Sequence, residues 1–293
     1  MSTRPDPQTL PVHAVRVPRA ARRQAWRALG LILLIVIAAA FVLPILWTVS
    51  TSLRVPADSF DNPPKWIPLN PKWSNYSAVF DQVPLATFLL NSVIVTGLIV
   101  VLQLITSTMS GYAFAFVRFR GKGAVFAMVL ATMMVPAQTT IIPVFVLIRD
   151  LGLADNLWSL VIPAAGGAFG TFLMRQYFLQ MPIELAEAAR VDGASHFQVF
   201  YRIYVPIALP PMATLAVLNF AAYWNEFFRP LIFLQSTEKF TLPLGLVSLQ
   251  GNLGTGSVSI VLAGVIIGLI PSIAIFLLAQ RYFVEGITTG SFR

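Results

Sequence analysis

Few side chains in this sequence are suited to acid–base, nucleophilic or metal chemistry. The 293 residues include no cysteine and only two histidines, His13 and His196. Thiolate metal sites and disulfides are therefore impossible, and two histidines are too few to build a metal cage. The long apolar stretches hold no paired carboxylates and no nucleophile beside a base. The sequence predicts neither a catalytic centre nor a bound metal.

Polar side chains are rare inside the apolar stretches, and those present are candidates for lining a path through the protein. They are Gln138, Thr139 and Thr140 in one stretch, and Trp224, Asn225 and Glu226 near the end of another. Polar groups inside a membrane are costly, so they tend to line a path or to pack between helices. For Glu226 two interpretations stay open, a direct ligand or a solvated acid near the outer surface.

A polar segment with helix-forming signals, residues 182–206, separates two of the apolar stretches. Pro182 suits the first turn of a helix, where its missing N–H costs nothing. Residues 183–192 continue that helix, and Gly193 can adopt the left-handed conformation that ends it. The pattern predicts a short helix followed by a sharp turn.

A second short helix is predicted to complete this hairpin. Ser195 and Gln198, three residues apart, indicate a capping box at its start. Four rings are expected on one face of it: Phe197, Phe200, Tyr201 and Tyr204. Because the hairpin combines small side chains, a glycine turn and aromatic rings without catalytic groups, we expect a surface that contacts another protein.

The composition sets the environment of this hairpin. Hydrophobic residues make up 57% of the chain and the mean hydropathy is +0.76, far above soluble norms. Uncharged stretches of about 20 residues or more are long enough for helices to cross the hydrocarbon core. We expect an all-α integral membrane protein with six spans, at approximately 28–49, 86–117, 123–148, 157–178, 207–234 and 257–280.

The distribution of charge predicts the orientation of these spans. With the N-terminus inside, fourteen of the 20 Lys and Arg residues fall on the inner side. This asymmetry follows the positive-inside rule and places both termini and the 182–206 hairpin in the cytoplasm. The net charge of +8 therefore reflects topology. Because no basic patch is interleaved with aromatic residues, a nucleic-acid partner is not expected.

The first 27 residues, rich in Pro and Arg, cannot bury an apolar face and are expected to form a mobile basic tail inside the cell. The apolar run that follows continues past the small residues 38–40, where a peptidase would cut a signal peptide. We therefore expect an uncleaved first span. Four glycines within the spans are expected at helix-packing positions: Gly97, Gly111, Gly264 and Gly268.

At the hairpin, the sequence resembles the EAA loop of ABC importer permeases. The residues that reproduce its spacing are Glu187, Ala188, Ala189, Gly193, Ile203 and Pro206. Val205 stands where the pattern has Leu, a conservative departure. The resemblance extends to Asn91 and Ser92, to Met134 through Pro136, to Trp224 through Phe227, and to the ending RYFVEGITTG. It covers roughly residues 28–293 and is closest in type to the maltose-type, MalG-like permeases of carbohydrate uptake.

This resemblance implies a MetI-like helical bundle in the bacterial inner membrane with a cytoplasmic coupling hairpin. It also implies three partners, namely a second permease subunit, a cytoplasmic ABC ATPase dimer and an extracytoplasmic solute-binding protein. The coupling residues would be Glu187, Ala188, Ala189, Asp192, Gly193, Ile203 and Pro206. Because the chain lacks a G-x-x-x-x-G-K-[ST] loop, ATP and Mg²⁺ would be bound by the ATPase, and this chain would carry no cofactor.

Several alternatives stay open. A sugar cargo would give Trp224 a role as a ring platform, although a helix-packing tryptophan is the favoured interpretation. Polyols and glycerol phosphate are other solutes of similar permeases. An ion-coupled secondary transporter would need intramembrane ionisable groups, and Glu226 is the only acid near a span core. A membrane-embedded enzyme is disfavoured because it would need the catalytic sets that are missing.

Overall fold

The computed structural model describes residues 19–55, 66–251 and 256–290, and within these ranges the chain is helical and forms no strand. It divides into two parts, residues 1–48 and residues 49–293. In the first part, helix α1 begins at Arg19 and continues into the second part, ending at Ser52. It contains a predominantly apolar segment, Trp26–Ser52, long enough to cross a membrane.

The predicted tail, residues 1–27, lies partly outside the described residues. Residues 19–27, which the sequence assigned to that tail, are instead the start of α1. Alanine, arginine and glutamine dominate this segment, and all three favour the helix. The correction moves the boundary of the first helix upstream by about three turns.

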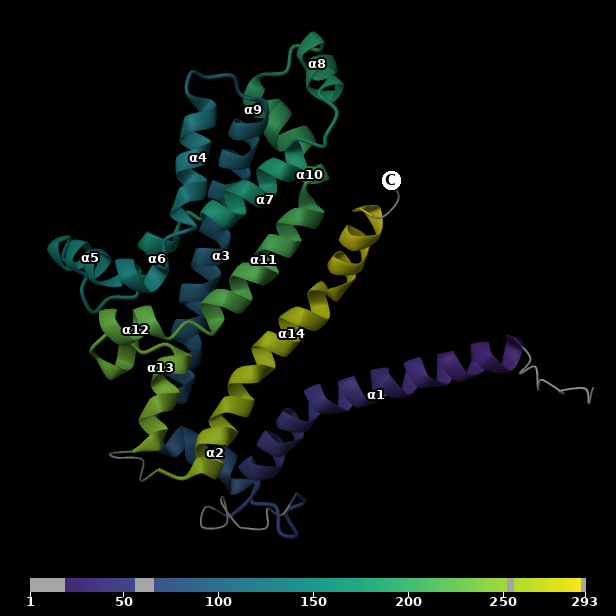
Figure 1. Ribbon diagram of the computed structural model, residues 1–293. Coiled ribbons are helices and arrows are strands. Elements are labelled where there is room, and N and C mark those ends of the chain that lie inside the picture. Colours follow the sequence, from purple (N-terminus) through teal and green to yellow (C-terminus); the bar gives the residue numbers. More distant parts are fainter. Residues whose placement is uncertain (1–18, 56–65, 252–255, 291–293) are drawn as a thin grey trace, which may run out of the picture. The chain divides into compact units, whose positions relative to one another are not determined.

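Two long helices run through the second part without a break. They are α3 (Leu85–Phe116) and α14 (Val258–Gly290), and both contain segments that satisfy the length and apolarity of a membrane span. Helices α7 (Ala168–Phe178) and α11 (Leu209–Trp224) pack against α3, and α14 packs against α11. Figure 1 shows α8 and α9 at one end of this part and α2 near the other.

The predicted span at 123–148 is not one continuous helix. It consists of α4 (Lys122–Thr132) and α5 (Ala137–Asp150), which meet at a bend of 100°. Pro136, at the start of α5, has extended backbone and no N–H to donate. The residue before a proline is also kept out of the helical region. Pro136 therefore causes the break. The spans were predicted from the length of uncharged stretches, and that criterion does not take proline into account.

The predicted spans at 157–178 and 207–234 are also interrupted. The first comprises α6 (Trp158–Val161), a 3₁₀ turn η2 (Ile162–Ala164) and then α7. The second comprises α10 (Val205–Ile207), α11 and α12 (Phe228–Phe233). Among the described residues, three helices meet the requirements of a span, or up to five segments if each bent pair counts as one. The number six stays a prediction.

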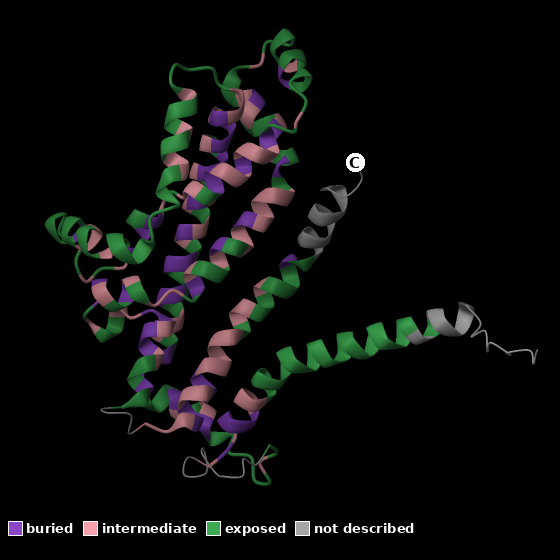
Figure 2. Cartoon of the chain, in the orientation of Figure 1, coloured by how far each residue is buried: buried purple, intermediate pink, exposed green. Residues whose placement is uncertain are grey.

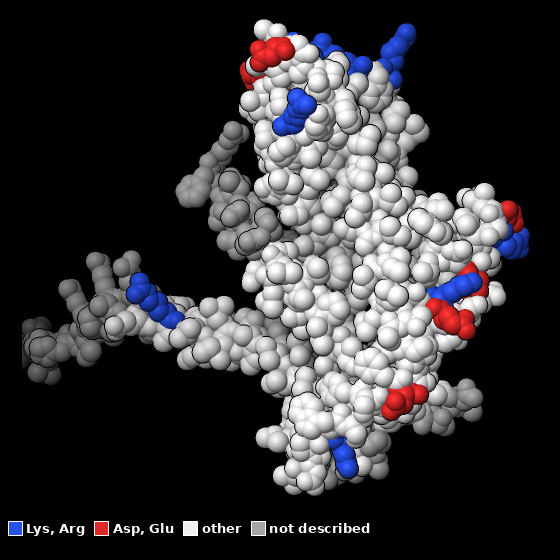
Figure 3. Space-filling model, turned by 180° about the vertical axis from the view of Figure 1, so that it is seen from behind, with Lys and Arg blue, Asp and Glu red and all other residues white. Residues whose placement is uncertain are grey.

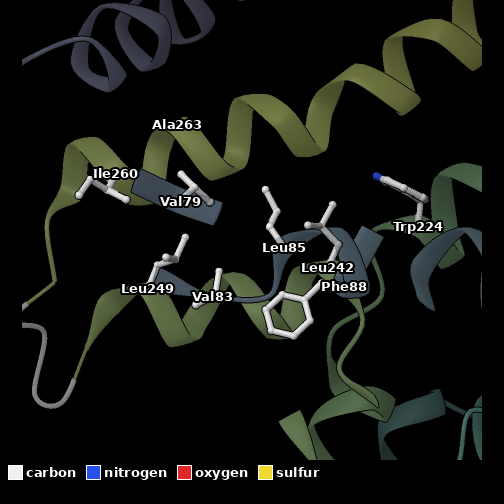
Figure 4. Close-up of a cluster of buried hydrophobic side chains, with 9 residues drawn as sticks. All are labelled: Val79, Val83, Leu85, Phe88, Trp224, Leu242, Leu249, Ile260 and Ala263. Atoms are coloured by element: carbon white, nitrogen blue, oxygen red, sulfur yellow. The ribbon is translucent and has the colours of Figure 1, made fainter. Parts of the chain in front are cut away.

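Shorter elements close one end of the second part. They are α2 (Ser74–Gln82), η4 (Thr237–Lys239), α13 (Leu242–Val247) and η5 (Ser248–Gln250). Buried side chains of α2, α13 and η5 join those of α3, α11 and α14 in the cluster drawn in Figure 4, which includes Val79, Phe88 and Leu242. Asn91 and Ser92 of α3 hold the loop beside them. The Asn91 amide donates to the carbonyls of Glu238 and Phe240, and the Leu242 N–H donates to the Ser92 hydroxyl at 2.7 Å.

Three of the four expected glycines lie in close helix contacts, and the contact at Gly111 is the one that involves a neighbouring backbone. A Cβ at Gly111 would lie 2.6 Å from the Met174 Cβ of α7, and Cβ atoms at Gly264 and Gly268 would meet α13 side chains at 2.7 and 2.9 Å. Gly97 differs, because a Cβ there would meet nothing within 4 Å. Gly97 has no packing role within the described part of this chain, and a role in packing against another subunit stays a prediction.

Burial and charge are distributed as a membrane protein requires. In Figure 2 the buried residues lie along α3 and the elements packed on it, whereas α8 is mostly exposed. In Figure 3 the charged side chains of the second part gather at the end that carries α8 and on the opposite half, with a broad uncharged surface between them. Such a surface suits the hydrocarbon core, where exposed charge is costly.

Candidate functional site: the 182–206 hairpin and a polar pocket joined by α11

The hairpin contains two short helices, as its sequence predicts. The first, α8, spans Glu184–Val191 and the second begins with α9 (His196–Val199). A π-helical turn, η3 (Phe200–Tyr204), then leads into α10. Between α8 and α9, Gly193 has a φ of +82°, the left-handed conformation that favours glycine. Ala194 donates its N–H to the Ala189 carbonyl at 2.9 Å, which closes the end of α8.

The capping box at the start of α9 is formed on both sides. The Gln198 N–H donates to the Ser195 hydroxyl at 3.3 Å, and the Ser195 N–H donates to the Gln198 side-chain oxygen at 2.7 Å. Two backbone donors that the helix itself leaves unpaired are thereby satisfied. The turn and the cap together fix the angle between the two short helices.

The inner face of the hairpin is anchored in the helical core. Ala186, Val199 and Tyr204 are buried in a cluster with Tyr112 of α3 and Phe178 of α7. Fully burying large side chains of this kind stabilises a packing arrangement by about 1.5–3 kcal/mol each. The predicted ring face is divided, because Tyr204 is buried while Phe197 is 65% exposed. The hairpin is therefore held firmly on one side and presents apolar surface on the other.

The outer face of the hairpin carries most of the predicted coupling residues. Glu187, Ala188, Asp192, Gly193 and Pro206 are exposed, and Ala189 and Ile203 are half-buried. Glu184 and Glu187 lie in the first turn of α8, where carboxylates are favoured by the helix dipole.

The opposite end of α8 carries the positive charge of Arg190. This side chain contacts His196, with its Nη2 3.0 Å from the Nδ1 of His196. The surface thus offers carboxylates at one end, a cation at the other, and small side chains between them.

A polar pocket of about 510 Å³ lies at the far end of α11. Its walls are the start of α5, the turn at 163–166 and the segment from Tyr223 to Phe233. Four of the six predicted path residues line it, namely Gln138, Thr140, Asn225 and Glu226. Gln138 and Thr140 are at least 85 residues from Asn225 and Glu226 in the sequence, and the fold brings all four to one cavity.

The two other predicted path residues lie outside this pocket. The Thr139 hydroxyl donates to the Pro136 carbonyl of its own helix at 2.7 Å. Trp224 is 2% exposed, stacks on Phe220 and donates from its indole nitrogen to the Gly268 carbonyl at 3.1 Å. Figure 4 shows its nitrogen turned toward α14. Trp224 fixes α11 to α14, and its position does not suit a ring platform for a sugar.

Glu226 is held by an arginine that the sequence did not single out. Arg229 Nε and Nη2 donate to the two carboxylate oxygens, and Nη1 donates to the Leu160 carbonyl at 3.2 Å. The Glu226 and Arg229 side chains are 23% and 17% exposed. The arginine carbon Cζ also lies 5.3 Å from the Tyr223 ring centroid. This pair is partly buried and bidentate, the geometry in which such pairs are strongest.

Tyr223 separates this pocket from a second one of about 510 Å³, because it lines both. Gln103 of α3 donates to the Tyr223 hydroxyl at 2.7 Å and to the Ala164 carbonyl at 2.8 Å. Asn219 lines the second pocket, and its buried side-chain nitrogen has no hydrogen-bond partner among the described residues.

Gln103 could have been found as a polar residue inside an apolar stretch. Tyr223 could not, because its ring counts as apolar.

An acidic residue ties together the loops that follow two helices of the first pocket. Asp155 accepts hydrogen bonds from the Gln235 and Ser236 N–H groups, the Ser236 hydroxyl and the Lys239 ammonium group, at 2.5–3.0 Å. The Ser236 hydroxyl bond, then the two N–H bonds, hold the pKa of the Asp155 carboxyl well below its usual range. The loop after α5 is thereby tied to the loop after α12, and both helices wall the pocket.

Comparison with known proteins places this architecture in one family. The family of binding-protein-dependent transport system inner membrane components matches residues 103–288, more than half of the chain. The chain belongs to this family. The match includes the hairpin, α11 and both pockets. The permease is therefore a transport subunit.

Two curated relatives of this permease are informative. It is 37% identical over 217 residues to the arabinooligosaccharides transport system permease AraQ of Halalkalibacterium halodurans, covering 74% of this chain and 77% of the relative. It is 34% identical over 258 residues to the probable ABC transporter permease YurM of Bacillus subtilis, covering 86% and 84%.

A solved structure has the same fold as this permease. It is described as a bacterial ABC transporter involved in the import of the acidic polysaccharide alginate. The TM-score is 0.79 and the sequences are 28% identical, with 89% of this chain and 97% of that chain covered. The all-helical importer-permease fold expected from the sequence is confirmed.

Proposed function

We propose that this permease is one of two membrane subunits of an ATP-driven carbohydrate importer. In this proposal the 182–206 hairpin receives a cytoplasmic ATPase and the pocket at Glu226 forms part of the sugar path. The observation that carries it is the direct link between the two sites, because α11 begins just after the hairpin and ends at Tyr223 and Trp224 beside the pocket. A 16-residue helix spans about 24 Å.

The hairpin supports this proposal through its two unequal faces. Ala188 permits close approach of another protein, Glu187 offers an anion to basic groups, and Phe197 and Val191 add exposed apolar surface. Tyr204 and Val199 anchor the opposite face on α3 and α7. A displacement of the docked hairpin would therefore be passed to the helical core rather than absorbed by a loose loop.

The remaining partners and the topology belong to the same proposal. The ATPase dimer binds ATP and Mg²⁺, since this sequence has no phosphate loop, and a second permease subunit completes the channel. A solute-binding protein delivers the cargo on the outside, and both termini lie in the cytoplasm of the bacterial inner membrane, as the charge distribution favours. Closure of the ATPase opens the path outward, and hydrolysis returns it to the inward-open state.

A carbohydrate cargo is supported by the relative that transports arabinooligosaccharides and by the lining of the pocket. Gln138, Thr140 and Asn225 provide neutral hydrogen-bonding groups, and Tyr223 and Phe227 provide ring surfaces. Sugar sites combine such aromatic faces with a few polar groups. An ion-coupled transporter is less well supported, because Glu226 is already paired with Arg229.

Substitutions on the exposed face of the hairpin test the docking proposal. We expect Glu187→Lys and Gly193→Asp to lower ATPase copurification and uptake by at least about tenfold, because each removes more than about 1.4 kcal/mol from the contact. Membrane insertion should be unchanged, since neither residue lies in a span. Glu184→Lys is the matched control, an exposed acid in the same helix but outside the coupling pattern. Normal copurification and uptake in both variants would contradict the docking role.

A further inference from the structure

The Glu226–Arg229 pair carries an inference about the class of cargo, and it rests on the proposed function. We propose that the pocket accepts uncharged, hydroxyl-rich solutes and that the pair excludes solutes carrying a carboxylate or phosphate. Glu226 is the group that contacts the cargo, and Arg229 is a positioning residue. The fold by itself does not require this selectivity, because a solved structure with the same fold is described as an importer of the acidic polysaccharide alginate.

Arg229 is unavailable to an anionic solute because it is held on several sides. Its Nε and Nη2 donate to the Glu226 carboxylate, and its Nη1 donates to the Leu160 carbonyl. The guanidinium carbon Cζ lies 5.3 Å from the centroid of the Tyr223 ring. An anion could recruit this guanidinium only by displacing Glu226, which would leave a partly buried carboxylate without its partner.

The charge of the pocket supports the same selectivity. Among the described residues that line it, the charged ones are Glu226 and Arg229, and their charges cancel. The other polar lining groups are the neutral side chains of Gln138, Thr140, Asn225 and Tyr223. A solute with a net negative charge would leave water without a compensating cation in the pocket, whereas a neutral sugar would not.

Glu226 keeps capacity for a neutral sugar. Each carboxylate oxygen can accept about two hydrogen bonds, and Arg229 supplies one to each. The remaining acceptor positions suit two neighbouring hydroxyl groups. The Glu226 side chain is 23% exposed and lines the cavity, so it is within reach of a solute. Hydrogen bonds to a charged acceptor are stronger than neutral ones, which makes Glu226 the dominant polar contact.

The proposal predicts a change of selectivity when the charge on Glu226 is removed. Glu226→Gln keeps the shape of the side chain but leaves the Arg229 charge uncompensated in the pocket. We expect binding of a neutral trisaccharide to weaken about tenfold and binding of an acidic trisaccharide to strengthen about tenfold, with the gain lost at high salt. A role in folding alone would not reverse the preference between two ligands.

The experiment uses the assembled importer in lipid nanodiscs without its solute-binding protein, so that the membrane subunits alone select the ligand. Saturation-transfer NMR would compare maltotriose with trigalacturonate as neutral and acidic probes of equal ring number. The wild type should favour maltotriose, and Glu226→Gln should favour trigalacturonate. Asp150→Asn is the matched control, since Asp150 pairs with Arg149 at 3.0 Å and does not line the pocket.

An unchanged preference in Glu226→Gln would overturn the proposal, as would a wild type that binds trigalacturonate more tightly or binds neither probe. If the single variant fails to assemble, the charge-exchanged double variant Glu226→Arg/Arg229→Glu retains a neutral pair. It should keep the preference for maltotriose, and a reversal there would equally overturn the proposal. ATP-dependent uptake of either sugar by the complete importer is a separate readout, so the proposed function can stand when the selectivity claim fails.

Discussion

Two glycines on α3 show how differently identical residues can be used. Gly97 and Gly111 lie 14 residues apart in one apolar helix, and the sequence predicts packing roles for both. Only Gly111 faces another backbone, with Arg175 N 2.9 Å from the position of a Cβ. The apolar pattern indicates that a helix is buried in a membrane but not which side meets a neighbour, so sequence reasoning cannot separate the two residues.

Alanine substitutions at these glycines should therefore have opposite effects on stability. Gly111→Ala forces α3 and α7 apart and is expected to lower the free energy of unfolding by about 1–3 kcal/mol. Gly97→Ala places its methyl group in open space and is expected to raise helix stability by about 0.5–1 kcal/mol. Thermal unfolding of both variants in the same detergent measures the difference. Equal midpoints would show that the close contact at Gly111 carries no cost.

Residue type was a fair guide to the polar pocket but a poor guide to its aromatic neighbours. Gln138, Asn225 and Glu226 were predicted and line it, whereas Trp224, their neighbour in sequence, points to α14. Successive residues at the end of a helix project in different directions, so adjacency does not place side chains in one site. Arg229 was not predicted as a pocket residue, because the positive-inside rule counts it only as a charge in a loop between spans.

At the scale of elements, the loops after α5 and α12 are joined to each other and so hold the two helices that wall the pocket. Asp155 has a φ of 52°, a conformation that Asp and Asn tolerate better than most residues, and from there it reaches four donors. The predicted spans imply these loops only as connections between helices. The contact between the two loops joins residues about 80 positions apart, so no local sequence pattern predicts it.

The charge on Asp155 should make the stability of this brace depend on pH. Because the folded pKa lies below the ordinary value of 3.8, the stabilisation is fully present above about pH 5 and is lost as the pH falls below 4. Asp155→Asn keeps the backbone preference but removes the charge, and we expect a loss of about 1–2 kcal/mol at pH 7. The gap in unfolding midpoint between wild type and variant should shrink toward pH 3. A gap that is constant from pH 7 to pH 3 would contradict this account.

Helix boundaries were predicted correctly where local capping residues set them, and wrongly where prolines interrupt apolar stretches. The hairpin was predicted well, since Gly193, Ser195 and Gln198 determine their own neighbourhood. The bend of 100° between α4 and α5 was not, although Pro136 is visible in the sequence. That bend matters, because it turns the start of α5, with Gln138 and Thr140, into the wall of the pocket.

At the scale of the whole molecule, the second part combines an anchored surface for a partner and a polar pocket on one helical framework. The hairpin lies directly before α11 in the chain and the pocket lies directly after it, which is the link on which the proposed coupling rests. Length, hydropathy and the spacing of the coupling residues predicted this class of protein. They did not predict the charge pair that we propose as the basis of selectivity.

The most direct test of the account is the energy source for uptake by the complete importer in proteoliposomes. We expect accumulation of the sugar bound by the cognate solute-binding protein to require ATP on the cytoplasmic side and to continue when an ionophore removes the proton gradient. Uptake that continues without ATP and without the ATPase, and that collapses with the proton gradient, would contradict the central claim that this permease is driven by a partner ATPase.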